Sequence, residues 1–157
     1  MTVTTNITRN PKMNGQSPDE GGHEECVLPV KGEPDLELLT RERLIQRWQC
    51  GSNAFFWRAE KAGRLVALRS EGLTRYAWSD VFVFEGGPPP EGMEVAYRRD
   101  LLTEQQVASF CSCSTGKILA KAGSGHLAVR RIGRACRFVP AEVARWQAAG
   151  WSRGRRR

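Results

Sequence analysis

The chain has 157 residues and a formal net charge of +7, with 24 lysines and arginines against 17 aspartates and glutamates. This length allows one or two small domains and excludes a large enzyme body, and no apolar run reaches the roughly 18 residues of a membrane span. Because the N-terminus also lacks the apolar stretch of a secretory signal, we expect a cytoplasmic protein with no membrane partner and five reduced cysteines.

The charge is distributed unevenly along the chain. Residues 1–37 carry a net charge of −4 and residues 85–100 carry −2, whereas residues 38–84 carry +4 and residues 101–150 carry +5. Four further arginines lie in residues 151–157. Each of the two basic stretches follows an acidic one, which suggests that the protein contacts a polyanionic partner at two places. The alternative is that both basic stretches are ordinary solvated surfaces.

Residues 1–36 are predicted to form a disordered acidic tail. The segment is rich in threonine, asparagine, glycine and proline, and its few apolar residues have neither a helical nor a strand period. Such a segment cannot bury enough apolar surface to offset its chain entropy.

The first block, residues 37–84, begins with a helix signal at Thr40, a favoured N-cap residue. Gly63 is placed to end a second helix, and residues 70–72 are suited to the turn of a hairpin. The elements we predict are helices over 41–48, 53–61 and 80–84 and strands over 65–69 and 74–78.

Residues 85–100 are predicted to be a linker. Three consecutive prolines follow two glycines, a composition that neither a helix interior nor a central strand accommodates. As a flexible coil, these sixteen residues would average roughly 20–24 Å from end to end.

The second block, residues 101–150, repeats the pattern of the first. Thr103 is a good N-cap, and Gln106 three residues later completes the pattern of a capping box. Gly133 and Arg134 form the turn of a predicted hairpin. The predicted elements are helices over 104–111, 115–122 and 140–149 and strands over 127–132 and 135–139, followed by a basic tail over 151–157.

The two blocks begin alike and are predicted to be diverged copies of one small fold. Leu38-Leu39-Thr40 recurs as Leu101-Leu102-Thr103, an offset of 63 residues. Without a gap, this offset aligns Phe55 with Ile118.

Each block has the residues of two helices joined by a short turn. The second block provides a small residue on its first helix, a small residue in the turn and a branched apolar residue on its second helix, and the first block matches this pattern less well. A second helix held in this way protrudes far enough to enter a DNA major groove about 12 Å wide. The three positions are Ala108, Ser112 and Ile118 in the second block and Ile45, Gln49 and Phe55 in the first.

The polar sides of the second helices and the two hairpins are the predicted DNA contacts. Asparagine and arginine can pair with adenine and guanine, whereas lysine holds phosphate. Residues 130–137 place four arginines around a tight turn, with Arg131 and Arg137 expected on one face, although a charged, solvated edge is the alternative. The predicted DNA-binding residues are Ser52, Asn53, Arg58, Arg69, Arg75, Ser114, Thr115, Lys117, Lys121, Arg130, Arg131, Arg134 and Arg137.

Residues 101–146 resemble the excisionase-type winged helix-turn-helix domains of the MerR superfamily, and residues 38–84 resemble the same family more weakly. In the second block the resemblance rests on Leu101-Leu102-Thr103, Ser114, Gly125-His126-Leu127 and Arg131-Ile132-Gly133-Arg134. In the first block it rests on Leu38-Leu39-Thr40, Gly63-Arg64-Leu65 and the segment 76–81. Lys121 departs from the family pattern, which usually has an apolar residue there.

The resemblance implies a mainly α fold with small β-hairpins: two tandem winged helix-turn-helix domains that bind specific double-stranded DNA. We expect a transcriptional regulator of a bacterium or mobile element, associated with the nucleoid, acting as a monomer with an internal pseudo-dimer on an asymmetric site. One alternative is a recombination directionality factor or another architectural protein that bends DNA. A second is an adaptor, in which the second copy binds DNA and the first binds a protein such as RNA polymerase.

Other chemistry is not indicated. The spacing of Cys111, Cys113, His126 and Cys136 is not that of a zinc site, and cysteines at apolar positions act as small hydrophobes. The chain has no nucleophile elbow, phosphate-binding loop or dinucleotide-binding glycine motif. We therefore expect no enzymatic activity, no catalytic residue, no metal and no cofactor.

Overall fold

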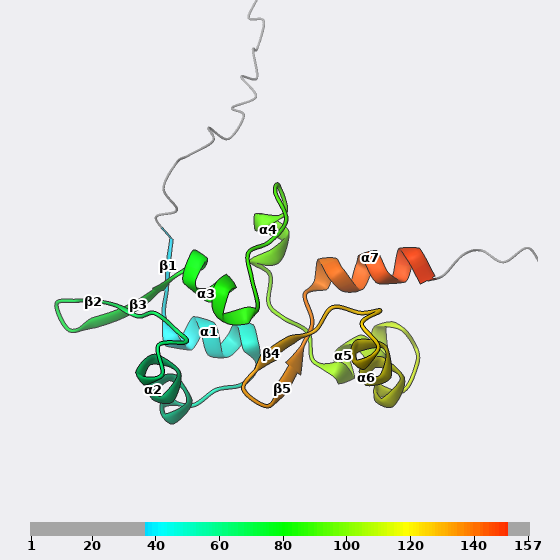
Figure 1. Ribbon diagram of the computed structural model, residues 1–157, viewed down its shortest axis with the longest axis horizontal. Coiled ribbons are helices and arrows are strands. Elements are labelled where there is room, and N and C mark those ends of the chain that lie inside the picture. The colour runs from blue at the N-terminus through cyan, green and yellow to red at the C-terminus, as the bar shows by residue number, and fades with distance from the viewer. Residues whose placement is uncertain (1–36, 151–157) are drawn as a thin grey trace, which may run out of the picture. The chain divides into compact units, whose positions relative to one another are not determined.

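The computed structural model describes residues 37–150, which contain seven helices and two small antiparallel sheets (Figure 1). The predicted mixture of helices with small β-hairpins is confirmed. The predictions for residues 1–36 and 151–157 lie outside the described residues. Within the described range, no helix combines the length and the apolar composition needed to cross a bilayer.

The first block forms a three-stranded sheet and three helices. The sheet has the strand order β1 (Leu38–Leu39), β3 (Leu73–Ala77), β2 (Leu68–Ser70), with Leu39 opposite Tyr76. Glu71 and Gly72 connect β2 and β3 with φ angles of 50° and 78°, the left-handed values that a two-residue hairpin turn requires. In chain order the elements are β1 (Leu38–Leu39), α1 (Arg41–Trp48), α2 (Asn53–Lys61), β2 (Leu68–Ser70), β3 (Leu73–Ala77) and α3 (Trp78–Glu85).

The second block has the same order of elements with one fewer strand. Thr103 and Gln106 form the predicted capping box at the start of its first helix. A single bridge between Leu102 and Phe138 takes the place that β1 has in the first block. The elements are α5 (Glu104–Phe110), α6 (Thr115–Gly123), β4 (Arg130–Ile132), β5 (Ala135–Arg137) and α7 (Pro140–Gly150).

The gapless alignment of the two blocks is wrong after the first helix. Ser52, the N-cap of α2, follows the N-cap Thr40 by twelve positions, whereas Ser114, the N-cap of α6, follows Thr103 by eleven, so the first block has one extra residue between the starts of its two helices. Gly51, with a φ of 120°, directly precedes Ser52. Phe56, fully buried, therefore takes the place of Ile118, while Phe55, predicted for that place, is half-buried.

Residues 85–100 are an ordered connection, which corrects the prediction of a flexible coil. They include the short helix α4 (Glu94–Tyr97), and the Tyr97 side chain is buried. The backbone beyond α4 lies along α1, where the amide of Leu101 donates a 2.9 Å hydrogen bond to the carbonyl of Arg47. Gly86 and Gly87 end α3, donating to the carbonyls of Val83 and Phe82 at 3.2 and 2.8 Å, and the prolines come after them. The residues that follow the prolines carry apolar side chains that the fold buries.

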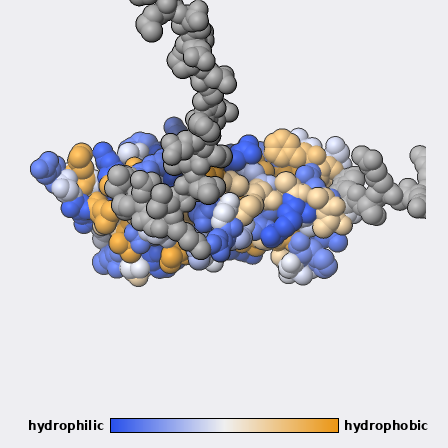
Figure 2. Space-filling view, turned by 90° about the horizontal axis from the view of Figure 1, so that it is seen from above, coloured by the Kyte–Doolittle hydropathy of each residue, from blue (hydrophilic) through white to orange (hydrophobic). Residues whose placement is uncertain are grey.

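The two blocks share one hydrophobic core. Its cluster contains Leu44 and Phe56 of the first block together with Leu101, Ile132 and Val139 of the second. A second, smaller cluster lies among α5, α6 and α7. On the face shown in Figure 2, hydrophobic patches lie among hydrophilic residues. The blocks are therefore packed against each other and are not joined by a free tether.

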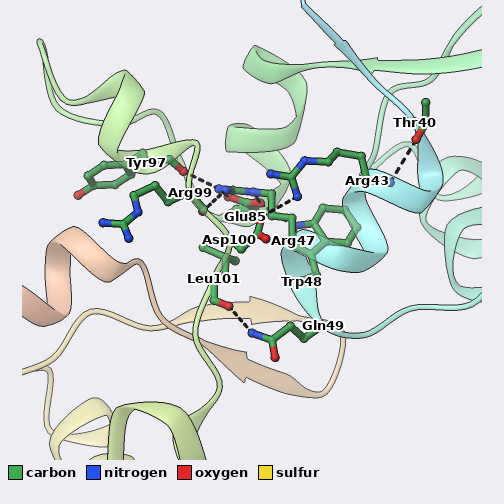
Figure 3. Close-up of polar contacts among 10 residues, drawn as sticks. All are labelled: Thr40, Arg43, Arg47, Trp48, Gln49, Glu85, Tyr97, Arg99, Asp100 and Leu101. Atoms are coloured by element: carbon green, nitrogen blue, oxygen red, sulfur yellow. Dashed lines mark hydrogen bonds and ion pairs between the residues drawn. The ribbon is translucent and has the colours of Figure 1, made fainter. Parts of the chain in front are cut away.

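A buried ion pair fixes the connection to α1. Arg47 donates to both carboxylate oxygens of Glu85, at 2.7 and 2.8 Å, and the two side chains are 0% and 3% exposed. The Trp48 indole donates to the same carboxylate at 2.5 Å. The remaining donors of Arg47 bind the carbonyls of Tyr97 and Arg99, at 2.8 and 2.5 Å (Figure 3).

Replacing Glu85 by glutamine is expected to lower the free energy of unfolding by about 3–5 kcal/mol, because it leaves the charge of Arg47 buried without a counter-charge. Urea unfolding of the full chain measures this loss. The control is Asp100→Asn, which breaks the exposed pair between Arg43 and Asp100 and should cost less than about 1 kcal/mol. Equal losses in the two variants would contradict the assignment.

Candidate nucleic-acid interface

Helices α2 and α6 each turn a polar side outward. Ser52 accepts a hydrogen bond from the amide of Phe55 and Ser114 accepts one from the amide of Lys117, each at 3.3 Å. The buried Phe56 and Ile118 anchor the opposite side of the two helices. Both serine hydroxyls are thus used as N-caps, and Asn53 and Lys117 in the first turns of the two helices are exposed.

On α2, Asn53 and Arg58 are exposed, as the prediction of DNA contacts requires. The aromatic run that follows Ala54 divides between core and surface. Phe56 stacks on Trp48 with ring centroids 5.7 Å apart, while Trp57 is 58% exposed and lies under the Lys61 ammonium at 4.7 Å.

On α6, Lys117 is exposed, whereas Thr115 and Lys121 are half-buried. Both lysines line a hollow that also contains Cys113, His126 and Trp146. Lys121 corresponds to Ala59, which is buried in the first block. Lys121 is only half-buried and lines the hollow, so its long side chain is accommodated there.

The hairpin of the first block is less available than predicted. Glu60 accepts hydrogen bonds from Arg69 at 2.6 Å, from Arg41 at 2.9 Å and from the Tyr76 hydroxyl at 2.5 Å. Arg75 is half-buried and donates to the carbonyl of its neighbour in the chain. Arg69 is therefore partly neutralised by Glu60.

This cluster shifts three pKa values, and the hydrogen bonds to Tyr76 and Glu60 raise that of Arg41. Burial raises the pKa of Tyr76 to about 12, and the hydrogen bond to Glu60 adds to the effect. Burial alone would raise the pKa of Glu60, but the hydrogen bonds from Tyr76 and Arg41 outweigh it and lower that pKa. The cluster therefore holds Glu60 as a carboxylate and Tyr76 as a phenol at neutral pH.

The hairpin of the second block corrects the prediction for Arg137. The register pairs Arg137 with Arg130, so its side chain lies on the face opposite to that of Arg131. Arg137 is only 8% exposed and donates to the carbonyls of Trp48 and Gln49, at 2.6 and 3.1 Å. It caps the C-terminal end of α1 in the other block and is not available to DNA.

The remaining hairpin arginines differ in exposure. Arg130 is half-buried, with its guanidinium 5.9 Å from the centre of the Tyr97 ring. Arg131 and Arg134 are exposed. Arg64, directly after Gly63 and not among the predicted DNA contacts, is also exposed.

Within residues 37–150, no group of three or more histidine, cysteine, aspartate or glutamate side chains is placed to hold a metal ion. Cys111 is buried and accepts a hydrogen bond from the Gln147 amide, while Cys113 and Cys136 are half-buried. These thiols pack in or beside the smaller hydrophobic cluster.

Comparisons with protein-family models, with curated proteins and with solved structures give no match to this chain.

Tyr76 is expected to titrate at about 12 in the folded protein, against about 10 for an ordinary tyrosine. Because the folded-state pKa is the higher one, the contribution of Tyr76 to the free energy of unfolding is fully present below about pH 10 and is lost as the pH rises towards 12. An NMR titration of the tyrosine ring carbons, which separates Tyr76 from Tyr97, measures the value. Glu60→Gln should lower it, and a native Tyr76 that titrates near 10 contradicts the cluster.

Proposed function

We propose that this chain binds specific double-stranded DNA through two winged helix-turn-helix modules and regulates transcription. In this interpretation α2 and α6 are the helices that enter the major groove, and the β4–β5 hairpin is the wing. The observation that carries the proposal is the pair of second helices, α2 anchored by the buried Phe56 and Ala59 and α6 by the buried Ile118, each with exposed polar residues on its other side.

The distribution of charge supports this assignment. Among residues 37–150, Arg58, Lys117, Arg131 and Arg134 are exposed and none of them forms an ion pair. Cations without a protein counter-charge are free to neutralise phosphate, which supplies much of the affinity for DNA.

The packing of the blocks implies a fixed spacing between the two groove-binding helices. The Gln49 side chain at the end of α1 donates to the carbonyl of Leu101 and to the side chain of Gln106, at 2.7 and 2.8 Å. Together with the shared core, these bonds restrict movement of one block relative to the other. The expected site therefore has two unlike half-sites at one invariant separation.

A transcriptional regulator and a recombination directionality factor would both bind DNA through the surface proposed above. The two functions differ in the genomic sites that the protein occupies. Genome-wide occupancy of the protein should fall on promoters if it is a regulator. Occupancy confined to a single attachment site would identify a recombination directionality factor.

The double variant Lys117→Gln/Arg131→Gln should weaken duplex binding and reduce the slope of log affinity against log salt by about two units, because two phosphate contacts are lost. Fluorescence anisotropy with a labelled duplex at several salt concentrations measures the slope. The control is Arg145→Gln, since Arg145 is on α7, pairs with Glu142 and has no place in the proposed interface. An unchanged slope in the double variant would remove both side chains from the interface.

The exposed residues of the β2–β3 hairpin favour a second candidate function, in which the first block contacts a protein partner such as RNA polymerase. Leu68 and Leu73, at the two sides of the turn, are 43% and 53% exposed, and the basic residue between them in the chain, Arg69, is paired with Glu60. Exposed apolar side chains beside a neutralised charge are more typical of a protein contact than of a phosphate contact.

Leu68→Ser/Leu73→Ser is expected to leave duplex affinity unchanged and to abolish the retention of purified RNA polymerase on a bound promoter duplex. Both side chains are exposed, so the fold should tolerate the changes. Gel-shift analysis with and without polymerase measures both properties. Equal retention of polymerase by the variant and the parent protein would exclude the adaptor role.

A further inference from the structure

A hollow of about 520 Å³ lies where the two blocks meet at α2 and the tip of the β4–β5 hairpin. Three of its lining residues are arginines from separate segments: Arg58 on α2, Arg64 in the turn after α2, and Arg134 at the hairpin tip. The other two lining residues are Phe55 and Gly133. The hollow is therefore strongly basic and belongs to neither block alone.

The hairpin tip is held against α2 by a close contact. Gly133 has a φ of 62°, and a Cβ atom at this position would be 3.1 Å from the Phe55 ring. Phe55 in turn packs edge-on against Trp48, with ring centroids 6.2 Å apart. Glycine lets the tip approach the ring, and this approach brings Arg134 to the same hollow as Arg58.

The charge of the hollow is not balanced within the described part of the chain. No carboxylate lines it, and none of Arg58, Arg64 and Arg134 forms an ion pair among residues 37–150. Glu60, the nearest acid in sequence to Arg58, is occupied by Arg41 and Arg69. Three guanidinium groups around one hollow repel each other, and a bound anion would relieve this repulsion.

We propose that this junction hollow binds one phosphate group of the DNA backbone, held jointly by the two blocks. Guanidinium groups match phosphate because their parallel N–H donors pair with two oxygens at once. The inference rests on the proposed function, since the phosphate is that of a duplex whose groove receives α2. It adds a composite site that fixes the duplex at the boundary between the modules.

The test uses four variants of the full chain: Arg58→Gln, Arg64→Gln, Arg134→Gln and the triple variant. Each single change should weaken binding of a labelled duplex roughly 3- to 10-fold at moderate salt, and the triple variant should reduce the salt slope by only about one unit, because one phosphate is released. Arg99→Gln is the matched control, since Arg99 is exposed and outside the hollow, and it should leave the affinity unchanged.

A double-mutant cycle shows whether the arginines act on the same phosphate. The combined loss in Arg58→Gln/Arg134→Gln should be smaller than the product of the single losses if both side chains hold one group. Losses that multiply, together with a slope reduced by nearly three units, mean three separate phosphates and overturn the shared site.

Failure of this inference and failure of the proposed function give different results. If the parent protein binds duplex DNA and the triple variant keeps its salt slope, the hollow is outside the interface and only this inference is overturned. If the parent protein binds no duplex at low salt, both are overturned. Thermal unfolding is the folding check, and the single variants carry the test if the triple variant is unstable.

Discussion

The arrangement of this chain depends on the buried ion pair between Arg47 and Glu85. A guanidinium removed from water must have a counter-charge and hydrogen-bond acceptors, and the carboxylate with two backbone carbonyls supplies them. The carbonyls belong to the connection between the blocks, so the pair determines where the second block begins. The shared core then forms around Leu101, Ile132 and Val139.

Two groups of arginines in residues 37–150 have different roles. Arg47 and Arg137 are buried and bind backbone carbonyls of distant segments, so they contribute to the fold. Arg58, Arg131 and Arg134 remain exposed without an ion pair among residues 37–150. Net charge alone does not separate these groups, and the electrostatic argument for DNA binding rests only on the second.

Local signals predicted the helices well because caps and turns act over a few residues. The capping box at Thr103 and the hairpin turn at Gly133 are examples. The alignment of Phe55 with Ile118 was wrong because the first block has one extra residue between the N-caps of its two helices, which no periodicity reveals. The exposed side chains of α2 and α6 were predicted in part, but the burial of Arg137 was not, since its acceptors are nearly ninety residues earlier in the chain.

The hydrogen bonds from Arg137 to the end of α1 have a practical consequence for dissecting the protein. A fragment that contains only the first block would lose the donor to the Trp48 and Gln49 carbonyls and would expose core residues to water. A fragment that contains only the second would leave Arg137 without those acceptors. Truncation therefore confounds stability with recognition, and the contribution of each half to any ligand has to be measured by point substitution in the intact polypeptide.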